Sequence, residues 1–193
     1  MRANRCVRVC ARLILLVIVT ATALLAPPPP LFAAGAPPAD ADPPVTVPAI
    51  GRAWPVGSRP RVLRGWEPPA TAYGPGHRGV DLAAPAGTPV RAVARGRVAF
   101  AGRVAGRGVV SVDLTGTGDP PLRTTYEPVT AAVEEGEEVE PGEVIGTVDA
   151  SGSHCTATCV HWGLRRGEGY LNPLSLLPPW LLHRGPSRLL PLA

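Results

Sequence analysis

Between residues 76 and 173, hydrophobic residues occur in short runs that glycine and proline interrupt. Turn sequences such as Gly106-Arg107-Gly108 separate these runs, and no segment repeats its apolar residues with a sustained helical period. Short strands at regular spacing are typical of an all-β sandwich or barrel, which is the fold class that we predict. The expected strands contain Val90–Val93, Arg97–Phe100, Val109–Leu114, Leu122–Tyr126, Val144–Val148 and Val160–Leu164.

The N-terminus has a different pattern. Four arginines precede the apolar run Leu13–Leu25, and several small residues follow it. This order is typical of an export signal, which we expect over residues 1–34 with a cut point between Ala34 and about Ala41. Because the apolar run is short for a membrane span, membrane contact is expected only through an uncleaved signal. The mature protein is then secreted or lies on the cell-wall side of the membrane.

Composition divides the rest of the chain into three parts. Residues 35–53 are rich in proline and alanine and are expected to form an extended linker. Residues 54–177 contain the expected strands and form the β domain, with Trp54 and Trp66 as apolar anchors. Residues 178–193 form a Leu/Pro-rich tail, which either packs on the sheet or frays.

The formal net charge of +4 overstates the basic character of the mature protein. All 19 basic residues are arginine and four of them lie in the signal, which leaves 15 against 15 Asp and Glu. A basic footprint for nucleic acid is therefore absent, and we expect no nucleic-acid partner. The glycine-turn β pattern also resembles lipoyl or biotinyl carrier domains, but the chain has no lysine to which such a group could be attached.

Three residues suggest a metal site. His77 and Asp81 are four residues apart in a segment that leads into a strand, and His161 lies in a late strand. Two imidazoles and one carboxylate are a typical ligand set for a catalytic zinc, whose fourth position is left to water. The spacing alone does not distinguish such ligands from ordinary turn residues.

The surrounding sequence resembles one family. Residues 77–90, His-Arg-Gly-Val-Asp-Leu-Ala-Ala-Pro-Ala-Gly-Thr-Pro-Val, closely resemble the opening motif of lysostaphin-like (LytM-type) zinc endopeptidases. Several motifs in the right order are far more specific than one, and the resemblance covers about Gly76 to Leu177. The later matches are the strand segment at 94–102, which begins Ala-Arg-Gly-Arg-Val and is similar to the family's Ala-x-x-Gly-x-Val strand, a Val-x-x-Gly-x-x-Ile-Gly hairpin at 139–146, the last-ligand strand at 160–165, and Asn172-Pro173.

The resemblance implies a compact antiparallel β domain that holds one Zn²⁺ through His77, Asp81 and His161. It also implies a metallo-endopeptidase that acts on peptide bonds in peptidoglycan stems or cross-bridges. In such a site the metal polarises the scissile carbonyl and acidifies its bound water. Further groups must take the proton of the water and stabilise the oxyanion.

The chain departs from the family at the two positions where active members have auxiliary histidines. One position begins the His-x-His pair of the last strand and is Cys159 here, and the other follows Tyr126 by two residues and is Pro128. Losing a general base or an oxyanion donor typically costs about 10²–10⁴-fold in rate. Glu127 is a weaker substitute, because its side chain is expected to face the opposite side of the strand from position 128.

Two cysteines remain after Cys6 and Cys10 leave with the signal. In an oxidising compartment such a pair favours a disulfide, here between Cys155 and Cys159 beside the site. Otherwise Cys159 is a free thiolate that acts as a base or a fourth zinc ligand, or it simply fills space. His154 is either a residue that the loop brings near the metal or an exposed loop residue. The catalytic groups thus stay open, with Cys159 and His154 as candidates.

Two functions stay open. The first is an exported zinc endopeptidase of peptidoglycan with altered proton-transfer groups. The second is a catalytically degenerate domain that keeps its zinc and binds wall peptides or regulates a cell-wall hydrolase, which is then its partner. The three retained ligands favour the first function, and the two lost histidines favour the second.

Overall fold

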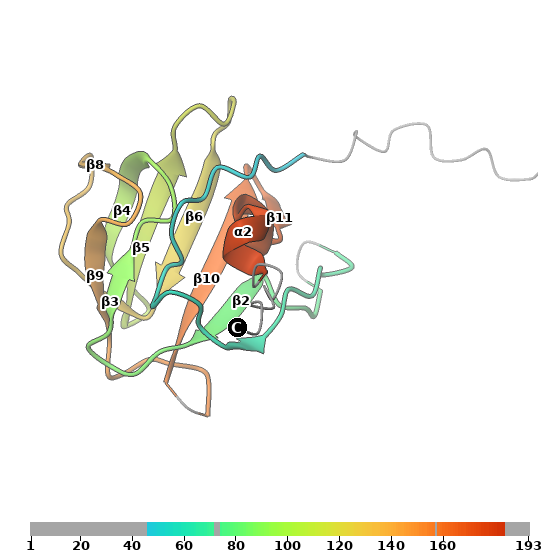
Figure 1. Ribbon diagram of the computed structural model, residues 1–193. Coiled ribbons are helices and arrows are strands. Elements are labelled where there is room, and N and C mark those ends of the chain that lie inside the picture. Colours follow the sequence, from blue (N-terminus) through green and yellow to red (C-terminus); the bar gives the residue numbers. More distant parts are fainter. Residues whose placement is uncertain (1–45, 72–73, 157, 184–193) are drawn as a thin grey trace, which may run out of the picture. The chain divides into compact units, whose positions relative to one another are not determined.

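The computed structural model describes residues 46–71, 74–156 and 158–183, which belong to one compact unit. The expected signal at 1–34, most of the expected linker, and the tail beyond His183 lie outside the described residues. Within the described residues, no helix has the length and apolar character needed to cross a membrane. The described fold is almost entirely β, with two short helices near its C-terminal end (Figure 1), which confirms the predicted fold class.

A large sheet has eight strands in the order β1-β2-β10-β6-β5-β4-β8, with β11 also paired to β10. All of its strand pairs are antiparallel. Figure 1 shows β10 between β2 and β6, which is the part of the sheet that positions the site. The strands are β1 (Val62–Arg64), β2 (Gly79–Ala83), β4 (Gly96–Val104), β5 (Arg107–Leu114), β6 (Leu122–Glu127), β8 (Glu138–Val139), β10 (Cys159–Arg166) and β11 (Gly169–Leu171).

A smaller antiparallel sheet has the order β3-β9-β7. Its strands are β3 (Pro89–Arg91), β7 (Val129–Ala131) and β9 (Val144–Val148). Val90 and Ile145 of this sheet belong to the same buried hydrophobic cluster as Val112 and Leu114 of the large sheet. The two sheets therefore share one core, and each of the six predicted runs overlaps a strand.

Residues of β2 and β10 alternate between the core and the opposite face of the sheet, because successive side chains of a strand point to opposite faces. The core-facing residues are at most 1% exposed: Val80, Leu82, Val160, Trp162 and Leu164. On the other face, Asp81 lies opposite His161 in the register of the two strands. The alternation that predicts the strands therefore also places two of the expected ligands side by side.

Both ends of the β domain extend further than expected. Of the residues assigned to the linker, Gly51 is buried and its amide donates to the carbonyl of Leu176 at 2.7 Å. At the other end, Trp54 Nε1 donates to the carbonyl of Leu181 at 3.2 Å, in the region expected to be the tail. The helical segments here are η1 (Pro173–Leu176) and α2 (Pro179–Leu182). Their leucines pack against the core, so the described part of the tail packs instead of fraying.

Candidate metal centre

His77, Asp81 and His161 converge at the β2–β10 pair. His77 Nε2 lies 3.1 Å from both Asp81 Oδ1 and His161 Nδ1, and His161 Nδ1 lies 2.9 Å from Asp81 Oδ1. Adjacent ligand atoms of a tetrahedral zinc with bonds of about 2.0–2.1 Å are roughly 3.3 Å apart. The three donor atoms thus have nearly the spacing that a zinc ion requires.

The contacts of His77 prepare it for metal binding. Its Nδ1 lies 2.6 Å from the carbonyl oxygen of Gly65, which can only accept, so Nδ1 carries the proton. Nε2 then presents a lone pair to the other two donors, which is the usual form of a metal-bound histidine. A β-bridge between Glu67 and His77 also holds this segment in place. The donor set therefore fits zinc in its chemistry as well as its spacing.

Gly79 allows β2 and β10 to approach closely beside the site. A Cβ at this position would lie 2.4 Å from the carbonyl oxygen of Trp162 and 2.6 Å from Nε2 of His161. Both distances are too short for any side chain, so the His161 ring occupies space that only glycine leaves open. The glycine of the His-Arg-Gly-Val-Asp motif is thus required by packing.

Asp81 is buried, with 2% exposure, and ionised. Burial acts to raise the pKa of its carboxyl, but hydrogen bonds from His161 and His154 outweigh burial and lower the pKa to about 2. At neutral pH the group is therefore a carboxylate, the form in which it binds a cation.

A fourth histidine reaches the site from the loop before β10. His154 Nε2 lies 3.0 Å from Asp81 Oδ2, and its ring nitrogen is within 4.8 Å of the donor atoms of His77, Asp81 and His161. His154, one of the two catalytic candidates, thus brings an imidazole to the site. His154 is an exposed residue of the loop, as one alternative expects, and its ring also contacts Asp81, as the other expects.

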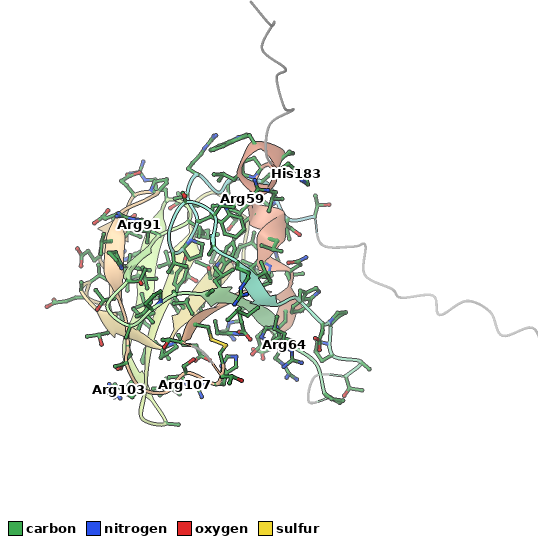
Figure 2. All side chains as sticks on the ribbon, turned by 60° about the horizontal axis from the view of Figure 1, so that its bottom comes forward. Arg59, Arg64, Arg91, Arg103, Arg107 and His183 are labelled. Carbon is green, nitrogen blue, oxygen red and sulfur yellow. A yellow bond between two sulfur atoms is a disulfide. The ribbon has the colours of Figure 1, made fainter. Side chains whose placement is uncertain are left out.

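The structure joins Cys155 and Cys159 in a disulfide beside the site, with their Cα atoms 6.1 Å apart, in agreement with the expected pair (Figure 2). The interpretations of Cys159 as a free base or as a fourth zinc ligand are wrong in this structure, because its sulfur is bonded to another sulfur. Cys159 is the first residue of β10, so its bond to Cys155 attaches the loop that carries His154 to this strand.

Glu127 also faces the site, contrary to expectation. It lies opposite His161 in the register of β6 and β10, and both residues line the same groove. The expectation assumed that position 128 faces the site. Instead, Tyr126 is fully buried in the core, so the alternation of the strand turns Glu127 outward. The Glu127 carboxylate accepts a hydrogen bond from Arg107 Nη1 at 2.9 Å.

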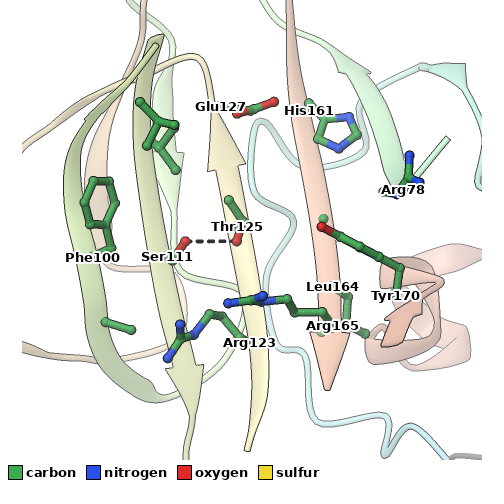
Figure 3. Close-up of a pocket in the computed structure, with 14 residues that line it drawn as sticks. Arg78, Phe100, Ser111, Arg123, Thr125, Glu127, His161, Leu164, Arg165 and Tyr170 are labelled. Atoms are coloured by element: carbon green, nitrogen blue, oxygen red, sulfur yellow. Dashed lines mark hydrogen bonds between the residues drawn. The ribbon is translucent and has the colours of Figure 1, made fainter. Parts of the chain in front are cut away.

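A groove of about 540 Å³ extends from His161 over the outer face of the large sheet (Figure 3). Its charged and aromatic lining residues are Arg78, Phe100, Arg123, Glu127, Arg165 and Tyr170. Arg78 lies over the ring of Tyr170, with 5.5 Å between the guanidinium carbon and the ring centroid. Three of the four charged side chains are arginines, and one of these, Arg123, is already paired with Asp113 at 2.6 Å.

Comparison with known proteins agrees with this geometry. Residues 75–173 match the family model of peptidase family M23. An uncharacterized protein of Mycobacterium tuberculosis is 43% identical over 148 residues, which are 74% of this chain and 55% of that protein. The chain thus spans about half the length of this relative. The DD-carboxypeptidase/endopeptidase Mpg of Neisseria gonorrhoeae is 37% identical over 103 residues, which are 53% of this chain and 23% of Mpg.

Solved structures share the fold. A mutant catalytic domain of the prophage-encoded M23 protein EnpA from Enterococcus faecalis has a TM-score of 0.50 and 27% identity, covering 61% of this chain and 91% of that domain. The catalytic domain of the antimicrobial peptidase lysostaphin from Staphylococcus simulans has a TM-score of 0.51 and 23% identity, covering 64% of this chain and 93% of that domain. The resemblance inferred from the sequence motifs is confirmed, and the chain belongs to peptidase family M23.

Proposed function

We propose that this chain is an exported zinc-binding metallo-endopeptidase that acts on peptide bonds of cell-wall peptidoglycan. The observation that carries the proposal is the triangle of His77 Nε2, Asp81 Oδ1 and His161 Nδ1, with edges of 2.9–3.1 Å, at one end of a groove. Two relatives support the substrate class: Mpg is named a DD-carboxypeptidase/endopeptidase, and NlpD of Salmonella dublin a murein hydrolase activator. The expected export signal would place the protein on the same side of the membrane as the wall.

In this function each residue has a separate task. His77, Asp81 and His161 hold zinc, which when bound polarises a carbonyl and acidifies water. Glu127 faces the groove beside His161 and is the carboxylate placed to accept a proton, while Arg107 orients it through their ion pair at 2.9 Å. The arginines of the groove bind the carboxylates of a wall peptide.

The loop before β10 favours a second function. In it, the domain keeps its zinc but binds wall peptides, or regulates a cell-wall hydrolase, without cleaving. The supporting observation is that Cys159 and Pro128 supply no acid or base, while His154 already contacts Asp81 at 3.0 Å. The groove would then bind peptide without turnover.

One experiment separates the two functions. Zinc-loaded protein is incubated with peptidoglycan and with short wall peptides, and both new amino groups and retained peptide are measured. Cleavage that a chelator stops and zinc restores supports the endopeptidase, and retained peptide without cleavage supports the binding domain. A protein that takes up no zinc contradicts both.

Glu127→Gln tests the proposed base. It should slow cleavage by about 10²–10⁴-fold with zinc content unchanged, because the amide keeps the shape of the side chain and cannot accept a proton as a base. Glu134→Gln is the matched control, since Glu134 is exposed and does not line the groove. Equal rates for Glu127→Gln and native protein would exclude Glu127 as the base.

A further inference from the structure

The loop before β10 contacts both positions at which the chain departs from the family pattern. Cys159 is bonded to Cys155 of the loop, and Pro128 lies against Gly152, where an added Cβ would be 3.7 Å from Pro128 Cβ. We propose that His154 is a fourth metal ligand, held by the disulfide, and that it closes the coordination position otherwise left to water. This inference rests on the zinc site of the proposed function. A site closed by His154 holds no metal-bound water, so it corresponds to the second function, in which the domain keeps its zinc without cleaving, and the endopeptidase would require His154 to leave the metal.

His154 is the most exposed of the four residues that gather at the site. Its side chain is 36% exposed, whereas those of His161, His77 and Asp81 are 15%, 6% and 3% exposed. Its ring centroid lies 5.5 Å from that of His161 and 6.3 Å from that of His77. Of these four residues His154 is thus the most open to solvent, while the groove reaches the cluster at His161.

The chemistry of His154 suits a ligand. A carboxylate only accepts hydrogen bonds, so in the present contact Nε2 donates its proton to Asp81 Oδ2. When the proton moves to Nδ1, Nε2 offers a lone pair to a metal instead. Three imidazoles and one carboxylate complete a tetrahedral zinc site, and a site with four protein ligands is closed.

Covalent and polar contacts tie both neighbours of His154 to β10. Cys155 is bonded to Cys159, and Ser153 Oγ lies 3.3 Å from Cys159 Sγ. The amide of Cys155 also donates to Ser153 Oγ at 3.3 Å. These contacts restrict the segment around His154, so less conformational entropy is lost when its ring is held at the site. Cys159 thus helps to hold His154 in the loop.

Cobalt in place of zinc reports the coordination of the site. Native Co²⁺ protein should show a four-coordinate visible spectrum that does not change when azide is added. His154→Ala should open one position, so azide binds and changes the spectrum, and the affinity for metal should fall by at least about tenfold. The paired variant Cys155→Ala/Cys159→Ala should shift the spectrum in the same direction, and His183→Ala, at an exposed histidine of the C-terminal segment, should match native protein.

His154→Gln separates a ligand from a residue that only orients Asp81. Glutamine can still donate a hydrogen bond to Oδ2, but it is a poor zinc ligand, so this variant should behave like His154→Ala. A native-like spectrum for either variant, or azide binding by the native protein, would overturn the inference. Native protein that binds neither Co²⁺ nor Zn²⁺ would instead refute the underlying zinc site. Should the paired cysteine variant fail to fold, the two His154 variants still decide the question.

Discussion

Two parts of the molecule meet at the metal centre, and different forces hold them. β2 and β10 are paired from Gly79↔Gly163 to Ala83↔Cys159, and their inward side chains are fully buried. The loop that carries His154 has mainly exposed or half-buried residues and is attached through one disulfide and a few hydrogen bonds. Pairing and burial act over many residues of the strands, whereas the position of the loop depends on one covalent bond and a few hydrogen bonds.

This difference separates the strand residues that match the opening motif of the family from the loop that carries His154. The residues that match the family motif lie on or next to the paired strands, where the register fixes their spacing. Cys159 and Pro128, at the two positions where the family pattern leads us to expect auxiliary histidines, lie beside the loop, and the register of β2 and β10 is regular there. His154 can thus contact Asp81 while the register of β2 and β10 stays regular.

The largest expected effect is the loss of zinc affinity when a donor is removed from β10. His161→Ala removes a donor from β10, and no other described strand residue can move into its place, so zinc affinity should fall by at least about 100-fold. Competition with a zinc indicator measures the affinity, with exposed His183→Ala as the control. Near-native affinity in His161→Ala would mean that the strands do not hold the metal.

Gly79→Ala tests the close approach of the two strands. The added Cβ would meet the Trp162 carbonyl at 2.4 Å, so the pair must separate, and unfolding should cost about 1–3 kcal/mol less than in native protein. Denaturant titration measures this difference. Gly65→Ala is a control in the same neighbourhood, because a Cβ there meets nothing within 4 Å. Equal stabilities of the two variants would contradict the packing role of Gly79.

Removal of the disulfide tests the loop side. Because the bond closes a short loop, Cys155→Ala/Cys159→Ala should lower the free energy of unfolding by no more than about 2 kcal/mol. Its main effect should be local: amides near His154 exchange hydrogen faster, while amides of β2 and β10 keep their protection. Uniform loss of protection across both strands would show that the loop and the strands form one cooperative unit.

The smallest effect is expected in the groove. Arg165→Ala should weaken binding of a carboxylate-bearing wall peptide by about fivefold or less, because a solvated ion pair contributes at most about 1 kcal/mol. Arg95→Ala is a charge-matched control, since Arg95 is exposed outside the groove and pairs with Glu140 at 3.3 Å. Binding assays at low and high salt measure both variants, and an equal loss in both would exclude a specific role for Arg165.

Errors in the sequence-based expectations arose where contacts between distant segments decide. Glu127 was expected to face away from the site, but burial of its neighbour Tyr126 sets the orientation of the strand. The end of the expected linker is folded because Gly51 bonds to Leu176, which is far away in the chain. Zinc binding by His77, Asp81 and His161 stays a prediction, which their convergence in the structure supports.

The sequence by itself determined the all-β fold class, the approximate strands and the family, because alternation, turns and motifs are local patterns. It also identified the three candidate ligands through the motif around them. Only the tertiary structure decided that His154 contacts Asp81 and that Glu127 lines the groove beside His161. These contacts join residues from strands and loops that are far apart in the sequence. Local patterns such as alternation and turns do not specify which distant residues become neighbours.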